Sequence, residues 1–199
     1  WHKLQLAPGS SVLVPLCGDS PDMQWLLDAG HFVIGGDLNE QALLNFLTRH
    51  DLAYQRIEYS GLIELRGERI KLFAGDFMAL GLEHTGVISG FYDRAATIAL
   101  PYVMRRNYAN HLIDLVGEAG AGLLISIDYD QSEMNGPPFS VPADSIQALY
   151  GRAFTLETAG QDDGPDVLGS LRDRGVSALV ESAFVCRAPG CIAQKEQLV

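Results

Sequence analysis

Short apolar runs alternate along the chain with segments of helical periodicity. The runs end at glycine or proline and have the length of buried strands, whereas the segments between them place apolar residues three or four positions apart. Residues 51–67 are mixed and polar, and we expect an excursion or a short hairpin there. The pattern predicts strands at 12–14, 31–34, 70–74, 86–93, 122–129, 154–158 and 178–186, and helices at 23–27, 40–49, 95–100, 105–116 and 144–150.

This alternation predicts a doubly wound α/β fold. The sheet is expected to be mostly parallel with helices on both faces, and the last two strands follow each other directly, which predicts an antiparallel hairpin at one edge. A chain of 199 residues is long enough to bury one substantial core. We therefore expect a single domain over residues 1–187 and a frayed polar tail over 188–199.

The segment from Val12 to Asp37 predicts a nucleoside site. It contains a strand, a turn with Gly18, a helix and a second strand that ends at Asp37. An acidic residue about 20 positions after the glycine is where a half-Rossmann unit binds ribose hydroxyls. The glycine lets the backbone approach the ligand, because it has no Cβ. The alternative is that Asp37 only ends a strand in a turn.

The turn itself selects among nucleosides. Residues 15–22 hold one glycine and the acids Asp19 and Asp22, instead of the three glycines of a dinucleotide fingerprint. Carboxylates at this position repel a pyrophosphate and favour a cationic group, such as the sulfonium and ammonium of S-adenosylmethionine. The pattern therefore favours a methyltransferase over a nicotinamide dehydrogenase.

Two further strand ends carry candidate chemistry. Gly75 and Asp76 follow the third strand, where an acid or a backbone amide can read the adenine edge and Phe77 can pack on the ring. Asp93 and Arg94 follow the next strand, at the point where open sheets bind ligands. We take both as candidate catalytic residues, Arg94 as a fixed cation for an anionic group. The alternatives are a turn with a core phenylalanine and a local Asp93–Arg94 ion pair.

Composition narrows the choice of partner and compartment. The net charge of −11, from 14 basic and 25 acidic residues, argues against nucleic acid as a substrate. Three cysteines without metal-ligand spacing predict free thiols in a reducing cytoplasm and no metal site. The chain contains no apolar run long enough for a transmembrane helix, and its first residues lack the character of a signal peptide.

Three motifs give the sequence a family resemblance over roughly residues 8–187. VLVPLCG at 12–18, FYDRAA at 91–96 and GPPFSVP at 136–142 resemble the thiopurine S-methyltransferases, the bacterial branch most closely. The resemblance implies a seven-stranded, Rossmann-like, S-adenosylmethionine-dependent methyltransferase. Its implied acceptor is a small thiol of the thiopurine kind, or a selenium or tellurium oxyanion. We expect a monomer that binds neither nucleic acid nor membrane.

The resemblance also assigns site residues. It implies that Leu16 lines the cofactor site, and that Arg94 lies where the cofactor meets the acceptor. A second arginine of the family corresponds to Arg172 or Arg174. The full set of expected cofactor-binding residues is Leu16, Gly18, Asp37, Leu38, Gly75, Asp76, Phe77 and Arg94.

The chain departs from the family pattern at three places. Asp19 replaces a lysine, Asp37 replaces the longer glutamate, and Trp1 falls late in the family's aromatic N-terminal segment. The alternative function is therefore a non-catalytic protein that binds S-adenosylmethionine and lacks the N-terminal lid.

Overall fold

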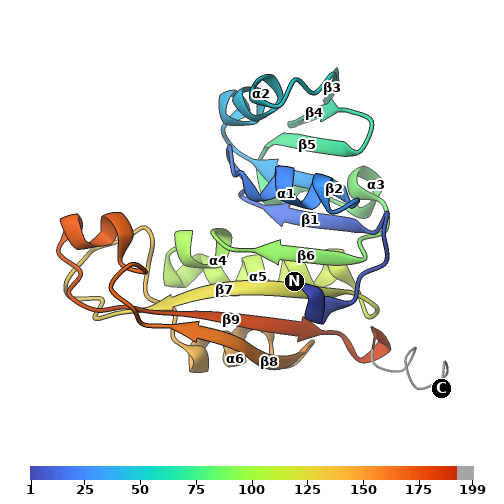
Figure 1. Ribbon diagram of the computed structural model, residues 1–199. Coiled ribbons are helices and arrows are strands. Elements are labelled where there is room, and N and C mark those ends of the chain that lie inside the picture. The colour runs from blue at the N-terminus through green and yellow to red at the C-terminus, as the bar shows by residue number, and fades with distance from the viewer. Residues whose placement is uncertain (192–199) are drawn as a thin grey trace. The chain divides into compact units, whose positions relative to one another are not determined.

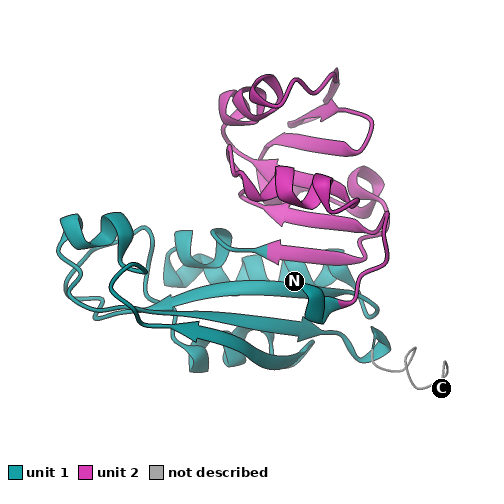
Figure 2. Ribbon diagram, viewed as in Figure 1, with its two compact units in different colours: residues 1–4, 93–199 teal, residues 5–92 magenta. Residues whose placement is uncertain are grey.

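The structure is a computed structural model that describes residues 1–191 (Figure 1). The chain forms two compact units (Figure 2). Unit 2 comprises residues 5–92, and unit 1 comprises residues 1–4 together with those from 93 onward. The single domain over 1–187 stays a prediction, and most of the expected tail, residues 192–199, lies outside the described residues.

Unit 2 contains the parallel strands of the predicted Rossmann-like half. Strand β1 (Ser11–Pro15) lies between β2 (Phe32–Asp37) and β6 (Gly90–Asp93), and β2 pairs in turn with β5 (Ile70–Gly75), all in parallel. Fully buried aliphatic side chains such as Val12, Leu13 and Val33 form its core. The helical segments of this unit are α1 (Asp22–Asp28), α2 (Glu40–Arg49), η2 (Phe77–Ala79) and α3 (Leu82–Thr85).

The polar stretch at 51–67 forms a hairpin, one of the two structures expected there. Strands β3 (Gln55–Tyr59) and β4 (Leu62–Arg66) pair antiparallel, and β4 pairs antiparallel with β5. Glu64 is fully buried in β4 but paired, because it accepts hydrogen bonds from the Tyr59 hydroxyl at 2.8 Å and from Arg66 Nη2 at 2.7 Å. The hairpin raises the number of strands from the expected seven to nine.

Unit 1 contains the antiparallel strands. Strand β9 (Val180–Arg187) lies between β7 (Ala121–Asp128) and β8 (Thr155–Asp162) and is antiparallel to both, which confirms the predicted edge hairpin. Its helical segments are η1 (His2–Leu4), α4 (Ala96–Ala99), α5 (Tyr102–Val116), α6 (Ala143–Tyr150) and η3 (Gly169–Arg174).

Several predicted boundaries were wrong, and three of the differences have a clear local reason. The strand expected from residue 86 begins at Gly90, because Gly86 takes a φ of 69° and caps α3. Helix α5 begins at Tyr102, three residues early, because Pro101 occupies its N-cap position. Helix α6 begins at Ala143, one residue early, because Pro142 occupies its N-cap position.

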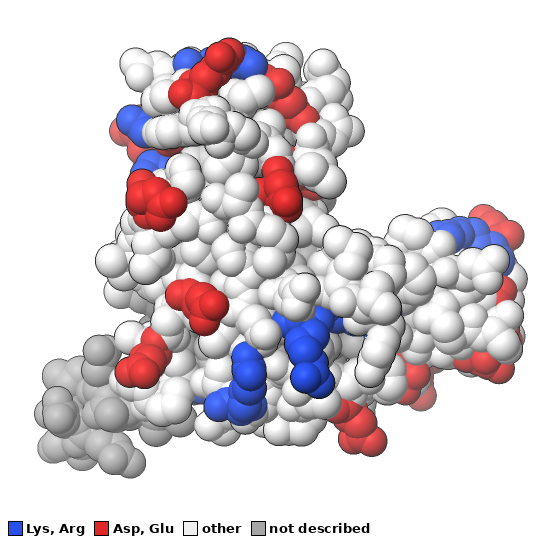
Figure 3. Space-filling model, turned by 180° about the vertical axis from the view of Figure 1, so that it is seen from behind, with Lys and Arg blue, Asp and Glu red and all other residues white. Residues whose placement is uncertain are grey.

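The surface charge is dispersed. Figure 3 shows acidic side chains scattered over the visible face of each unit, with no continuous acidic field. The acidic residues behind the net charge of −11 are therefore not gathered into one block on this face.

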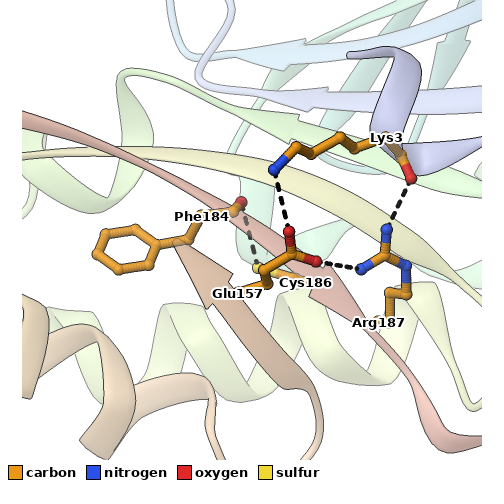
Figure 4. Close-up of polar contacts among 5 residues, drawn as sticks. All are labelled: Lys3, Glu157, Phe184, Cys186 and Arg187. Atoms are coloured by element: carbon orange, nitrogen blue, oxygen red, sulfur yellow. Dashed lines mark hydrogen bonds and ion pairs between the residues drawn. The ribbon is translucent and has the colours of Figure 1, made fainter. Parts of the chain in front are cut away.

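A polar cluster fastens the first residues to the antiparallel strands of unit 1 (Figure 4). Glu157 on β8 accepts from Lys3 Nζ at 3.0 Å and from Arg187 Nη1 at 3.2 Å, and Arg187 Nη2 donates to the Lys3 carbonyl at 2.6 Å. The two cations lower the pKa of Glu157, the Lys3 ammonium most. Segment η1 is thereby held against β8 and β9.

Candidate functional site

The carboxyl ends of β1, β2 and β5 meet at one edge of the unit 2 sheet. Pro15 pairs with Gly36, and Asp37 pairs with Ala74, so the three strands end level with one another. Parallel strands bind ligands at this edge. The register therefore brings together the expected cofactor residues that follow each strand, from Leu16 and Gly18 through Asp37 and Leu38 to Gly75 and Asp76.

Asp37 is held in place by the backbone. Its Oδ2 accepts from the Gly18 N–H at 2.9 Å, and its Oδ1 accepts from the Asn39 N–H at 2.8 Å. Each carboxylate oxygen has a second acceptor site, so the group still has capacity for a pair of hydroxyls. A fixed carboxylate with spare acceptor sites at the end of β2 is what a ribose diol requires.

The turn after β1 has a conformation that brings backbone toward this carboxylate. Leu16 has a φ of 47° and Gly18 a φ of 50°, both in the left-handed region. Such a conformation is costly for leucine and tends to occur at ligand sites. Cys17 between them is buried, and burial raises the pKa of its thiol, so that it is a neutral packing group and not a nucleophile.

The two oxygens of the Asp19 carboxylate have different surroundings, and the difference bears on the charge of the ligand. One of its carboxylate oxygens, Oδ2, pairs with Arg49. The other, Oδ1, is buried and has no hydrogen-bond partner among the described residues. A buried carboxylate oxygen without a donor is unfavourable, and a cationic donor at this turn would satisfy it. The residues present therefore fit S-adenosylmethionine.

The apolar side chains of this edge differ from those expected. Phe77 is only 6% exposed, and its ring packs so closely on Gly36 that a Cβ there would lie 3.1 Å from Cδ2. It is therefore a core residue, and stacking of its ring on an adenine was a wrong interpretation. Leu38 is 80% exposed and Met78 is 42% exposed. Met78 was not singled out in the sequence, although it follows Asp76 by two positions.

Gly75 and Asp76 have different roles. Asp76 is exposed, and its Oδ1 accepts from the Met78 N–H at 2.9 Å as the N-cap of η2. Gly75 has a φ of 142°, and a Cβ there would lie 2.7 Å from the Gly61 carbonyl oxygen. The β4–β5 pairing thus requires glycine at this point.

Replacing Gly75 with alanine is expected to lower the free energy of unfolding by about 3 kcal/mol. Both the unfavourable φ and the overlap with the Gly61 carbonyl contribute. Gly61→Ala is the matched control, because its φ is 84° but nothing lies within 4 Å of its Cβ position; it should cost about 1 kcal/mol. Urea unfolding of both variants measures the difference, and equal losses would contradict the close contact.

Asp93 is a buried structural group. It is completely buried, and four donors satisfy its carboxylate: the Ala96 and Thr97 N–H groups at 3.0 and 3.2 Å, the Thr97 hydroxyl at 2.6 Å and the Tyr108 hydroxyl at 2.8 Å. A side chain enclosed in this way does not contact a substrate. Our prediction that Asp93 is catalytic therefore needs correction: its carboxylate fixes the start of α4.

The remaining candidate cations, on the loop after β6 and in η3, belong to unit 1. Arg94 directly follows β6 and is exposed. Arg172 Nη2 donates to the Pro165 carbonyl at 2.7 Å, whereas Arg174 Nη1 donates to the Pro137 carbonyl at 2.9 Å. Of the two, Arg174 is therefore the one that contacts the Gly136–Pro142 motif.

Residues 1–191 contain no group of three or more histidine, cysteine, aspartate or glutamate side chains arranged to hold a metal ion. Over the same residues, no helix is both long and apolar enough to cross a membrane.

Comparison with known proteins agrees with this geometry. The family described as Thiopurine S-methyltransferase (TPMT) matches residues 1–188. A thiopurine S-methyltransferase of Pseudomonas aeruginosa (strain LESB58) is 40% identical over 183 residues, which cover 92% of this chain and 84% of that protein. One of Pseudomonas fluorescens (strain SBW25) is 40% identical over 188 residues, again 92% and 84%.

Solved structures show the same fold at low identity. An S-adenosylmethionine-dependent methyltransferase from Methanosarcina mazei matches with a TM-score of 0.69 and 12% identity, over 94% of this chain and 96% of that one. The N-methyltransferase NodS of Bradyrhizobium japonicum, in complex with S-adenosyl-L-homocysteine, matches with a TM-score of 0.62 and 13% identity, over 89% and 78%. These matches confirm the predicted methyltransferase fold.

Proposed function

Because the chain belongs to the thiopurine S-methyltransferase family, whose members depend on S-adenosylmethionine, we propose that it methylates the sulfur of a small thiopurine-like thiol. Selenium and tellurium oxyanions are the other acceptors that we propose. The observation that carries the proposal is the Asp37 carboxylate, fixed by Gly18 and Asn39 at the carboxyl edge of the parallel strands. Its geometry fits the ribose of the methyl donor.

In this proposal each cofactor residue contacts a different part of S-adenosylmethionine. Asp37 accepts from the ribose hydroxyls, and the backbone at Leu16 and Gly18 borders the ligand. The exposed side chains of Leu38 and Met78 offer apolar surface for the adenine, and the free oxygen of Asp19 faces its cationic end. When bound, S-adenosylmethionine supplies an electrophilic methyl group on a sulfonium sulfur, to which the electron pair of the broken bond returns.

The acceptor requires little help from acid–base groups. A thiolate is already the reactive form of a thiol, and its lone pair forms the new sulfur–carbon bond without a proton transfer in that step. Alignment of donor and acceptor then supplies most of the rate enhancement. We propose that Arg94, an exposed cation directly after β6, binds the anionic acceptor or the methionine carboxylate.

The test of the function is a labelled-methyl assay of the full chain over a panel of thiols, including a thiopurine, with selenite and tellurite as separate arms. Transfer to any of these acceptors supports the proposal. Binding of S-adenosylhomocysteine without transfer to any acceptor supports the alternative, a non-catalytic protein that binds the cofactor. The observation that favours this alternative is Asp19, which replaces the lysine expected from the family.

Replacing Arg94 with glutamine is expected to lower kcat/KM for an anionic acceptor about tenfold, because one charge-assisted hydrogen bond is lost. Arg94→Lys should recover part of the loss, and Arg106→Gln, an exposed arginine on α5, should change nothing. Steady-state kinetics of the three variants, with S-adenosylhomocysteine affinity measured alongside, separate the two proposed partners. Unchanged kcat/KM and unchanged affinity in Arg94→Gln would remove Arg94 from the site.

We propose that the protein acts as a monomer in the cytoplasm. All three cysteines, Cys17, Cys186 and Cys191, are free thiols, which fits a reducing compartment.

A further inference from the structure

The first turns of α5 hold a buried arginine that no carboxylate neutralises. Arg105 is only 7% exposed. Its Nε donates to the Leu100 carbonyl at 2.8 Å, and its guanidinium carbon lies 5.5 Å from the centre of the Phe139 ring. Among the described residues no aspartate or glutamate forms an ion pair with it. One N–H of the five is therefore used, and the outer nitrogens are left for another partner.

An unneutralised buried charge is costly. Burial lowers the pKa of the Arg105 guanidinium, and the groups that oppose this shift are the side chains of Tyr129 and Tyr102 and not a carboxylate. Buried charges in proteins are normally paired or bound to a ligand, because desolvation without a counter-charge is strongly unfavourable. Arg105 thus lacks the partner that its burial requires.

A cavity of about 570 Å³ opens beside this guanidinium. Among the described residues, Arg105 is the only charged one in its wall, which also includes the apolar side chains of Pro101, Phe139 and Pro142. This volume lies within the usual range for small-molecule sites, and the combination of apolar walls with a few polar groups is typical of them.

Two polar side chains in the wall are also available for hydrogen bonds to a ligand. Neither the Asn135 amide nor the Ser145 hydroxyl has a hydrogen-bond partner in the part of the chain that the structure describes. Their neighbours Gln131 and Ser140 differ, because the Gln131 side chain binds the Met134 carbonyl and the Ser140 N–H and so closes the loop. The cavity therefore presents Arg105, Asn135 and Ser145 together as available donors.

A second hollow of about 430 Å³ adjoins the first. The two share Tyr102, Arg105 and Ser145, and the second continues over Val103 and Leu149. Tyr102 and Val103 are both more than four-fifths exposed. The second hollow also contains Asp144 and Arg106, whose charges are opposite. An apolar body thus has room beside the cationic end of the cavity.

We propose that this cavity is a second ligand site, which binds a small organic carboxylate with an apolar body. The carboxylate lies on the Arg105 guanidinium and accepts from Ser145 and Asn135, and the body rests on the rings of Phe139 and Tyr102. A carboxylate fits better than a phosphate, because its single charge matches one arginine and its two oxygens match the planar fork.

The wall of this cavity includes none of the residues expected to bind the methyl donor. Every residue that lines it belongs to unit 1, whereas Gly18, Asp37 and Gly75 belong to unit 2. Helices α5 and α6 lie behind the sheet in Figure 1, and the reverse view in Figure 3 shows a group of Lys and Arg side chains on that face of unit 1. Local positive charge there attracts an anion in spite of the net negative charge of the chain.

The test uses 3-phenylpropionate and its uncharged counterpart 3-phenylpropanamide, titrated into the full chain by calorimetry and by amide NMR spectra. The acid is expected to bind at least tenfold more tightly than the amide, with shifted resonances confined to residues 101–106 and 131–149. Affinity for S-adenosylhomocysteine is measured on the same samples. If the chain does not bind S-adenosylhomocysteine, the proposed function is wrong, but binding of the acid in this cavity still supports the second site.

Variants identify the residues involved. Arg105→Lys keeps the charge but loses the fork, and should weaken binding of the acid about tenfold. Ser145→Asp places a carboxylate in the first turn of α6, where helices tolerate it, and should abolish binding of the acid by repulsion while it leaves the fold intact. Arg152→Lys, at an exposed arginine that lines neither hollow, is the matched control and should bind as the wild type does.

Three results would overturn the proposal. The first is equal affinity for the acid and the amide, and the second is unchanged binding of the acid by Ser145→Asp with a wild-type melting curve. The third is a set of shifted resonances centred on residues 16–19 and 37–39, which would place the acid in the methyl-donor site.

Discussion

Replacing Asp37 with alanine is expected to weaken binding of S-adenosylhomocysteine about 100-fold. Two charge-assisted hydrogen bonds to ribose hydroxyls are lost, each worth about 1.5–3 kcal/mol, and a tenfold loss of affinity corresponds to about 1.4 kcal/mol. The substitution also releases the Gly18 and Asn39 N–H groups, which the carboxylate holds at 2.9 and 2.8 Å. Isothermal titration calorimetry of wild type and variant gives the ratio directly.

Matched substitutions isolate the role of the carboxylate. Asp37→Glu introduces the family's residue and is expected to bind within a few-fold of the wild type, whereas Asp37→Asn should fall between wild type and alanine. Asp28→Asn is the control for lost charge, because Asp28 is exposed in the same unit and contacts only Gln24 through its side chain. If Asp37→Ala binds as tightly as Asp28→Asn, the ribose role is wrong.

Replacing Asp93 with alanine is expected to lower the free energy of unfolding by about 4 kcal/mol. The change leaves several buried donors without an acceptor, and each unsatisfied group costs about 1–3 kcal/mol. Burial raises the pKa of Tyr108 and Tyr150 well above the ordinary value, so both hydroxyls keep their protons. Since Thr97 donates its proton to Asp93, Tyr150 must donate to Thr97 across 2.7 Å. The network therefore loses its terminal acceptor.

Denaturation with urea measures this loss of stability. Substitutions that each remove one hydroxyl show how much each hydrogen bond to Asp93 contributes. Thr97→Val and Tyr108→Phe each remove one donor and should cost about 1 kcal/mol apiece. Asp93→Asn keeps one oxygen acceptor and should cost less than Asp93→Ala. A loss below about 1 kcal/mol in Asp93→Ala would show that the carboxylate is not the acceptor that anchors the start of α4.

The order of strands and helices was determined by the sequence alone. Alternating apolar runs and helical segments predicted every strand except those of the β3–β4 hairpin. The helix predicted at 40–49 matches α2, which Asn39 caps by accepting from the Ala42 N–H. Such features depend on neighbours within a few positions, because periodicity and capping are local. The hairpin was only a possibility, since its buried Glu64 is stabilised by Tyr59 and Arg66 and does not look like core.

The site was only half determined by the sequence. Spacing identified Gly18 and Asp37, because a turn, a helix and a strand of ordinary length fix that separation. Only the tertiary structure decided which side chains point into the core and which reach the ligand. Phe77 is buried against Gly36, Asp93 is enclosed by Thr97 and Tyr108, and Leu38 is exposed.

The burial of Arg105 is another feature that the sequence alone does not predict. In the sequence it is one arginine beside another on a helix, and nothing separates it from Arg106. In the structure the Phe139 loop covers Arg105 and leaves Arg106 exposed. Local pattern determined the elements of this protein, because secondary structure follows from neighbouring residues. Burial and unpaired charge were decided by the tertiary structure, because they depend on which segments of the chain pack together, as the Phe139 loop does on Arg105.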